Sequence, residues 1–209
     1  MGEKRFTAKK LAVLGVLTAL SLITFLIENL FPPLFIPGAK LGLANAFSFI
    51  ALVIYSPLEA FIIVGVRTIL GAVFAGNLSA VLYSFTGGIV SMAVSSVLLY
   101  CVHPKISVIC VSVIAAAFHN LTQNAVFVLL SATPLAFYYA PYLILLGVLS
   151  GAFIGAAVTL TVKRVPTKVF TRVTGLKNIE KIKLIPRVRS EQDKEREHRP
   201  TGVYTEVHD

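Results

Sequence analysis

Six stretches of apolar residues constrain the fold of this chain of 209 residues more than any motif. A membrane-spanning helix needs roughly 20 mostly apolar residues. By that measure the stretches fall at 8–30, 40–55, 57–75, 79–101, 105–130 and 135–162. Hydrophobic residues make up 56% of the chain and charged residues 14%, with a mean hydropathy of +0.81, which is typical of membrane-embedded proteins. We therefore predict an all-α, polytopic membrane protein with six transmembrane helices.

Turn-forming residues separate these stretches and support their boundaries. They are Pro32, Pro33, Pro37, Gly38, Ser56, Pro57, Gly76, Asn77, His103, Pro104, Thr133 and Pro134. The second stretch is short, so we expect its helix to be tilted or partly submerged. Pro141 lies inside the last stretch, where it is expected to kink the helix or delay its start.

Basic residues indicate the orientation of the helices, because Lys and Arg favour the cytosolic side of a membrane. They precede the first stretch, lie between the fourth and fifth, and follow the sixth: Lys4, Arg5, Lys9, Lys10, Lys105, Lys163, Arg164 and Lys168. We expect a multi-pass protein of the cell membrane with both termini cytosolic. The first stretch has the basic start of a signal peptide but no small-residue cleavage site after it, so we expect it to be retained as a helix.

The charge distribution divides the chain into two parts. Residues 1–165 form the predicted substrate-binding membrane domain, and residues 166–209 form a basic, very polar cytosolic tail that we expect to be partly disordered. The tail either lies against anionic lipid or is a solvated segment that only supports the topology.

Polar residues inside the apolar stretches are the main candidates for a site, because polar groups are costly at membrane depth and are usually kept for a function. Four of them stand together in the fifth stretch, and the predicted topology brings four more to the outer half of the membrane. The candidate substrate-binding residues are Lys40, Asn45, Arg67, Asn77, His119, Asn120, Gln123 and Asn124. Each amide alone could instead make a hydrogen bond between helices. Together with the positive charge of Lys40 and Arg67, they predict a pocket for a polar, anionic molecule.

Other polar residues have structural explanations. Ser56, Pro57 and Glu59 have the spacing of a capping box at the start of a helix. Glu28 is close enough to the outer end of the first stretch to reach the membrane interface. Cys101, His103 and Cys110 lack the paired spacing of zinc ligands, so no metal site is predicted.

Small residues form two stripes at helical spacing, which lets another helix approach closely. The stripe of Gly147, Gly151 and Gly155 is expected to pack within the protein. The stripe in the first stretch has a second interpretation, a docking face for a partner protein: Ala8, Ala12, Gly15 and Ala19.

Several kinds of catalysis find no support in the sequence. The chain has no phosphate-binding loop of the Walker type, so ATP hydrolysis would need another subunit. Its only aspartates are Asp193 and Asp209, both in the tail, so the membrane domain lacks the carboxylates that hold magnesium for diphosphate chemistry. His119 has no acid within local reach to support a serine nucleophile. We predict that the protein is not an enzyme and carries no cofactor.

Four segments carry a family resemblance: PGAKLGLANAFSFIAL at 37–52, VGVRTILGAVFAGN at 64–77, TGGIVSMAVSSVL at 86–98 and HNLTQN at 119–124. They resemble the Gx transporter family, whose older label is heptaprenyl diphosphate synthase component I and which is grouped with the substrate-binding S components of energy-coupling-factor transporters. The resemblance implies a six-helix bundle that binds a vitamin or related cofactor. It also implies docking, through small residues of the first helix, on a membrane coupling subunit joined to two ATPases.

Three functions therefore stay open. The first is an S component for uptake of a vitamin, flavin or quinone-related molecule. The second is a non-catalytic membrane accessory subunit of heptaprenyl diphosphate synthesis, which supplies the menaquinone side chain. The third is a solitary channel or facilitator. Expected partners under the first are the small molecule, the coupling subunit with its ATPases and the lipid bilayer, and no nucleic acid.

Overall fold

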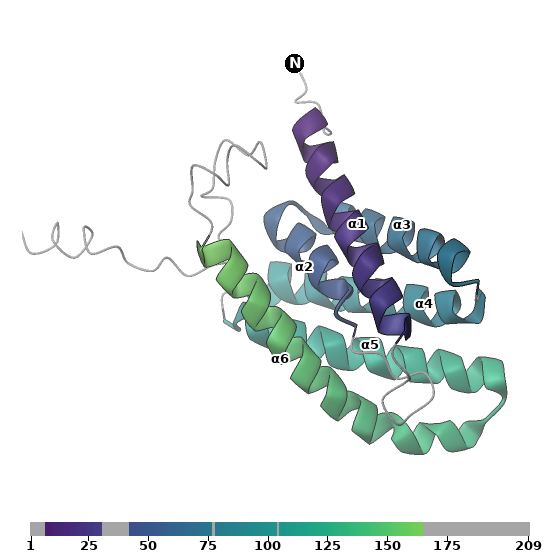
Figure 1. Cartoon of the computed structure of the whole chain (residues 1–209). Helices are drawn as coiled ribbons and strands as arrows, with labels where there is room; N and C mark the ends of the chain where they lie inside the picture. The colour runs from purple at the N-terminus through teal and green to yellow at the C-terminus, as the bar shows by residue number, and fades with distance from the viewer. Residues whose placement is uncertain (1–6, 31–41, 77, 104, 165–209) are drawn as a thin grey trace, which may run out of the picture.

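The computed structural model describes residues 7–30, 42–76, 78–103 and 105–164, and this part of the chain is helical apart from its turns (Figure 1). The all-α prediction is confirmed. The elements in chain order are α1 (Ala8–Leu30), α2 (Asn45–Ile54), α3 (Pro57–Ala75), α4 (Leu78–Val97), the π-helical turn η1 (Leu98–Val102), α5 (Val108–Ser131), the 3-10 helix η2 (Pro134–Tyr139) and α6 (Ala140–Arg164).

The helix ends follow the turn chemistry of the sequence. α3 has proline in its first turn and ends at Gly76, which adopts the left-handed conformation (φ 60°) that glycine tolerates best. The Ser107 hydroxyl caps α5 by accepting a hydrogen bond from the Cys110 N–H at 3.1 Å. Pro141 lies in the first turn of α6, so it delays the start of that helix rather than kinking it.

Five of the helices are long and apolar enough to cross a membrane, and α2 is shorter. The ten residues of α2 rise about 15 Å, roughly half the thickness of a bilayer's hydrocarbon core. The expectation of a short, partly submerged second helix therefore agrees with the described part of that stretch. Residues 31–41, including Lys40, lie outside the described residues.

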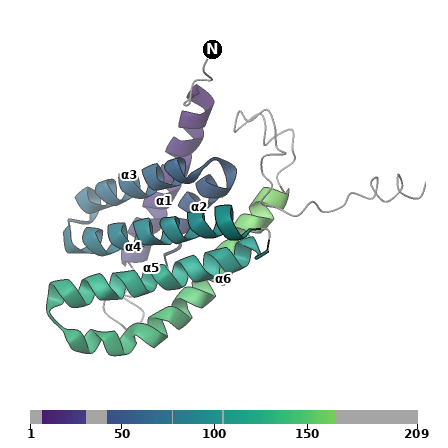
Figure 2. The same cartoon turned by 180° about the vertical axis from the view of Figure 1, so that it is seen from behind.

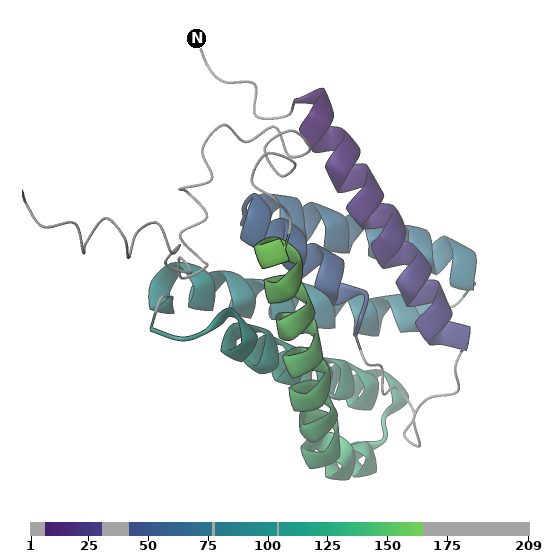
Figure 3. The same cartoon turned by 60° about the vertical axis from the view of Figure 1, so that its left-hand side comes forward.

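The helices form two layers. Figure 2 shows α3, α4 and α5 running side by side as one layer, and Figure 1 shows α1 and α6 crossing that layer obliquely on its opposite face. In Figures 1 and 3, α2 lies between α1 and α6. The first residues of α2 therefore enter the bundle between the two layers.

Unlike a soluble protein, this bundle exposes many large apolar side chains and buries many polar ones. Large apolar side chains are exposed on the outer faces, for example Val73, Leu129 and Phe153. Many of the fully buried side chains are polar: Ser21, Ser48, Glu59, Arg67, Thr68 and Ser95. An apolar exterior is stable against lipid tails, and buried polar groups need partners inside the bundle. This arrangement agrees with a multi-pass membrane protein.

Glycines allow α6 to pack directly on the backbone of α5. A Cβ atom would lie 2.9 Å from the Ala116 carbonyl oxygen if added to Gly147, and 2.7 Å from Val113 Cα if added to Gly151. At Gly155 it would lie 2.8 Å from Ile109 Cα. These distances are too short for any side chain, so the prediction that this stripe packs within the protein is confirmed.

Apart from the buried Arg67, the basic residues that the structure describes gather at one end of the bundle. Lys10, near the start of α1, contacts Glu59 at the start of α3. One apolar cluster joins the start of α3, the end of α4, the start of α5 and the end of α6 through Phe61, Leu98, Ile106 and Val162. Lys105, Lys163 and Arg164 stand beside this cluster in the sequence. This common basic end is the one predicted to face the cytosol, which stays a prediction.

Candidate functional site

Three of the predicted site residues form a buried hydrogen-bonded chain across α2, α3 and α5. Arg67 Nη2 donates to Asn45 Oδ1 at 3.1 Å, and Asn45 Nδ2 lies 3.2 Å from His119 Nδ1. Arginine can only donate, so the Asn45 oxygen faces Arg67 and its amide N–H₂ faces the histidine. Asn45 Nδ2 also lies 3.5 Å from His119 Nε2, so the amide faces both nitrogens of the imidazole ring.

Glycines make room for this chain of polar groups. Gly42, which precedes α2 with a φ of 70°, has its missing Cβ position 3.4 Å from the His119 ring. On α4, a Cβ added to Gly87 would meet Gln123 Cγ at 2.8 Å, and one added to Gly88 would lie 3.4 Å from Arg67 Nη2. The glycine-rich segment of α4 thus explains why large polar side chains of α3 and α5 fit inside a closely packed bundle.

Arg67 is the residue of this chain whose burial costs the most free energy, because its side chain is charged. Its side chain is 2% exposed, and the guanidinium lies over the Phe25 ring of α1, 5.7 Å from the ring centroid, within range of a cation–π interaction. Its Nε atom has no hydrogen-bond partner among the described residues. Glu28, also on α1, accepts a hydrogen bond from the Leu43 N–H at 2.7 Å. Contacts with α1 thus hold both Arg67 and the segment that leads into α2.

A small polar cavity adjoins this chain. It measures about 20 Å³, which is enough for a single water molecule. Its walls include Asn45, His119 and Asn120 together with three serines that the sequence interpretation had not singled out: Ser91, Ser95 and Ser112. Ser91 and Ser95 are four residues apart on α4, and this spacing on an apolar helix was the signal that could have identified them.

The other predicted residues of α5 have separate surroundings. Asn120 donates from Nδ2 to the Leu143 carbonyl oxygen of α6 at 2.9 Å. For this residue the structure thus shows a hydrogen bond between helices, which was the alternative to ligand binding for each amide. Gln123 packs near Gly87. Asn124 lines a second, larger pocket, and its Nδ2 atom has no partner among the described residues. Lys40 and Asn77 lie outside the described residues.

The second pocket lies where the end of α5 meets η2. Its volume is about 550 Å³, and it is lined by Asn124, Phe127, Thr133, Leu135, Ala136, Tyr138 and Tyr139. Of the predicted site residues that the structure describes, only Asn124 lines it. The turn after α5 that brings Tyr138 and Tyr139 of η2 to this pocket was not predicted.

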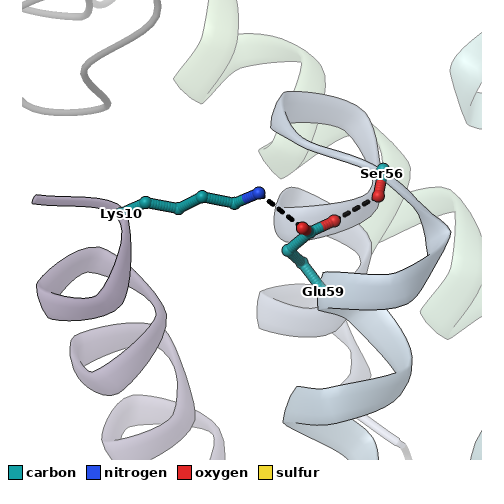
Figure 4. Close-up of polar contacts among 3 residues, drawn as sticks. All are labelled: Lys10, Ser56 and Glu59. Atoms are coloured by element: carbon teal, nitrogen blue, oxygen red, sulfur yellow. Dashed lines mark hydrogen bonds and ion pairs between the residues drawn. The ribbon is translucent and has the colours of Figure 1, made fainter. Parts of the chain in front are cut away.

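A separate polar cluster at the basic end ties α1 to α3 (Figure 4). Lys10 Nζ lies 2.5 Å from Glu59 Oε1, and the Ser56 hydroxyl donates to the same carboxylate. Lys10 also lies over the Tyr55 ring, 5.3 Å from its centroid. Ser56 makes no side-chain cap to the backbone. The capping-box prediction for Glu59 was therefore wrong, because the carboxylate binds an ammonium group from another helix instead.

The four small residues predicted for docking lie on an exposed face of α1. Ala8, Ala12, Gly15 and Ala19 are all exposed, and a Cβ added to Gly15 would meet no atom within 4 Å. Nothing in the described structure packs against Gly15. The assignment of this face to a partner stays a prediction.

Within the described residues, no group of three or more histidine, cysteine or acidic side chains is placed to hold a metal ion. Cys101 and Cys110 are both exposed thiols. The candidate site is thus a set of neutral and cationic donors and hydroxyl groups, suited to hydrogen bonding rather than to metal chemistry.

In the comparison with protein families, a family model described as heptaprenyl diphosphate synthase component I matches residues 17–161. These residues run from α1 to the last turn of α6. A search of curated proteins finds no match.

Proposed function

Because the chain belongs to the heptaprenyl diphosphate synthase component I family, we propose that it is a non-catalytic membrane subunit that binds a small molecule and acts together with a separate protein. The family description names a component, so an activity shared with a second protein is the natural expectation.

The observation that supports binding is the polar face of α5. His119, Asn120, Gln123 and Asn124 are 3 to 6% exposed, although they lie in the middle of a membrane-length helix. Polar groups in such a position cost free energy unless they are paired or serve a ligand. At one level this face borders the polar cavity, and one turn further it borders the larger pocket. The same helix therefore offers hydrogen-bonding groups to two cavities at different levels of the bundle.

The family description favours the accessory-subunit function over transport. The membrane domain contains no aspartate, so the metal-dependent condensation of prenyl diphosphates would take place on a partner that supplies the carboxylates. The membrane subunit would bind a lipophilic reactant or product close to the bilayer. In this function the partner is a soluble synthase.

A second candidate is the S component of an energy-coupling-factor type transporter, with a coupling subunit and two ATPases as partners. The exposed stripe on α1 favours it, since Gly15 and its neighbouring alanines leave room for another helix to approach. The two candidates differ in the partner and in the surface that binds it.

Affinity purification of the gently solubilised protein, followed by identification of the bound proteins, separates these candidates. The test compares the unmodified chain with Gly15→Leu, and Gly65→Leu on α3 is the matched control because a Cβ there also meets no atom within 4 Å. Recovery of a soluble synthase, unaffected by Gly15→Leu, supports the accessory function. Recovery of ATPases that are lost only in Gly15→Leu supports the transporter. Transport of a small molecule into liposomes by this chain without either partner would contradict the proposal and favour a solitary facilitator.

A further inference from the structure

We propose that the pocket between α5 and η2 binds an uncharged, flat aromatic molecule with a hydrogen-bond acceptor, and that Asn124 donates the hydrogen bond. This proposal rests on the proposed small-molecule function and specifies its site and ligand class. It also replaces the anionic ligand predicted from the sequence with a neutral one.

The pocket is built by a tight reversal of the chain. Ala132 ends α5 in the left-handed conformation (φ 49°), and the Ala136 N–H bonds to the Thr133 carbonyl oxygen at 3.1 Å as η2 begins. Pro134 in the first turn of η2 suits this geometry because its fixed φ is compatible with helical conformation. As a result, Tyr138 and Tyr139 of η2 border the same pocket as Asn124, which belongs to the preceding helix α5. The volume of about 550 Å³ is within the usual range for small-molecule sites.

Three of the seven residues that line the pocket are aromatic: Phe127, Tyr138 and Tyr139. Phe127 contacts Tyr83 of α4 edge to face, with 5.9 Å between ring centroids and 66° between ring planes. This is a favourable aromatic geometry, and it fixes one wall. Tyr138 is 82% exposed and Tyr139 is 47% exposed, so their rings have free surface for a ligand. Flat aromatic molecules are the ligands that stack most favourably on such walls.

Asn124 supplies the specific polar contact. Its side chain is 6% exposed, and its Nδ2 atom is buried without a partner in the described structure. A buried amide that lacks a hydrogen bond is unfavourable by roughly 1–3 kcal/mol. A ligand that carries a carbonyl oxygen or an unprotonated ring nitrogen would satisfy this donor.

The pocket walls also determine the ligand's charge. None of the seven lining residues in the described part of the chain is acidic or basic. Arg67, one of the two cations expected to attract an anion, is absent from this lining and donates to Asn45 instead. The other, Lys40, lies outside the described residues. An anion placed here would lose hydration without gaining a counter-charge, which is strongly unfavourable. The walls therefore select a neutral molecule.

Isothermal titration calorimetry of the purified full chain in detergent tests the proposal, with titration into empty micelles subtracted. The probe is 2-methyl-1,4-naphthoquinone, an uncharged two-ring molecule with two carbonyl acceptors. The comparison probe is 2-naphthoate, which has the same ring system and a negative charge. We expect the quinone to bind at least tenfold more tightly than the naphthoate.

Three variants locate the site. Asn124→Ala and Tyr139→Leu should each weaken quinone binding by about tenfold, since each removes one of the two contacts argued above. Tyr142→Leu is the matched control, because Tyr142 is 49% exposed on α6 and is not part of the pocket lining. Thermal unfolding of each variant checks that it folds.

The proposal is overturned if the quinone does not bind the unmodified chain, if naphthoate binds equally well, or if Asn124→Ala and Tyr139→Leu both bind like the parent. Capture of a protein partner without quinone binding would reject this inference and leave the proposed function standing. Quinone binding without capture of any partner would support this inference and reject the part of the proposed function that requires a partner.

Discussion

The α5–α6 hairpin and α1 carry the same kind of sequence feature and use it differently. Both have small residues at intervals of three or four along one face. On α6 these glycines touch the backbone of α5 at distances that no side chain would fit. On α1 the corresponding face is open, and only 17% of the residues in its membrane-length window are buried, against 39% for the last span.

The difference shows what small-residue spacing means physically. Such spacing permits a close approach between helices, and the partner is determined by the topology. The short η2 connection makes α5 and α6 antiparallel neighbours, so α6 finds its partner within the chain. α1 is attached to the bundle by other contacts, namely Phe25 over Arg67, Ser21 bonded to the Ala44 carbonyl oxygen, and Lys10 paired with Glu59. Its small residues are therefore free for a partner outside the chain.

The largest effect is expected for Gly151→Val. The new Cβ would lie 2.7 Å from Val113 Cα and 2.8 Å from the Ser112 carbonyl oxygen, and backbone atoms of a packed helix have little freedom to move away. We expect destabilisation of about 3 kcal/mol or more, at the upper end of the range for overpacked cores. Thermal unfolding in detergent measures it.

Gly15→Val is the matched control for this experiment, because it makes the same change at a glycine with no neighbour within 4 Å. Its stability should stay close to that of the parent. Equal destabilisation by the two substitutions would show that the α1 face is packed in the protein and would remove the contrast between the two regions.

Most of the fold could be predicted from hydropathy and turn residues. The bounds of α1 and α3 agree with those predicted, because apolar stretches of spanning length end at recognisable breaks. The last stretch divides into η2 and α6, which composition could not show because both parts are apolar. The π-helical turn at the end of α4 was also missed, since such a turn depends on local backbone packing rather than on residue type.

The site was harder to predict than the fold. The prediction placed Asn45, Arg67 and His119 in one site, and the structure joins these three residues in one hydrogen-bonded chain. Depth alone could not show that Asn120 would bond to the α6 backbone or that Asn124 would face a different pocket. Those outcomes depend on helix rotation and on the η2 turn. Charge pairing across helices, as between Lys10 and Glu59, likewise requires knowledge of which helices are neighbours.

A smaller effect, about 1–2 kcal/mol, is expected for Lys10→Met, which tests the attachment of α1 at the basic end. Methionine keeps much of the apolar stem but removes the ammonium group, so Glu59, 2% exposed, loses its ion pair at 2.5 Å. The estimate lies between the small value of an exposed ion pair and the larger cost of leaving a buried charge unpaired.

The double variant Lys10→Met with Glu59→Gln is the control for this test, since it removes both charges. It should recover part of the lost stability, and thermal unfolding of the single and double variants measures the coupling between the two residues. Additive losses would show that the two side chains do not interact and that α1 is held mainly by Phe25 and Ser21.

The smallest effect is expected for Gly15→Ala, and it defines the α1 face most sharply. Alanine adds a single methyl group into open space and favours the helix by roughly 0.5–1 kcal/mol relative to glycine. Because the apolar surroundings of a membrane helix already favour the helical backbone, we expect a gain near the lower limit. Alanine also matches Ala8, Ala12 and Ala19 on the same face, so a partner complex lost in Gly15→Leu should survive in Gly15→Ala. A fall in the unfolding temperature of Gly15→Ala would mean that a neighbour approaches Gly15 within the protein. The contrast between an internally packed α6 and an externally available α1 would then have to be abandoned.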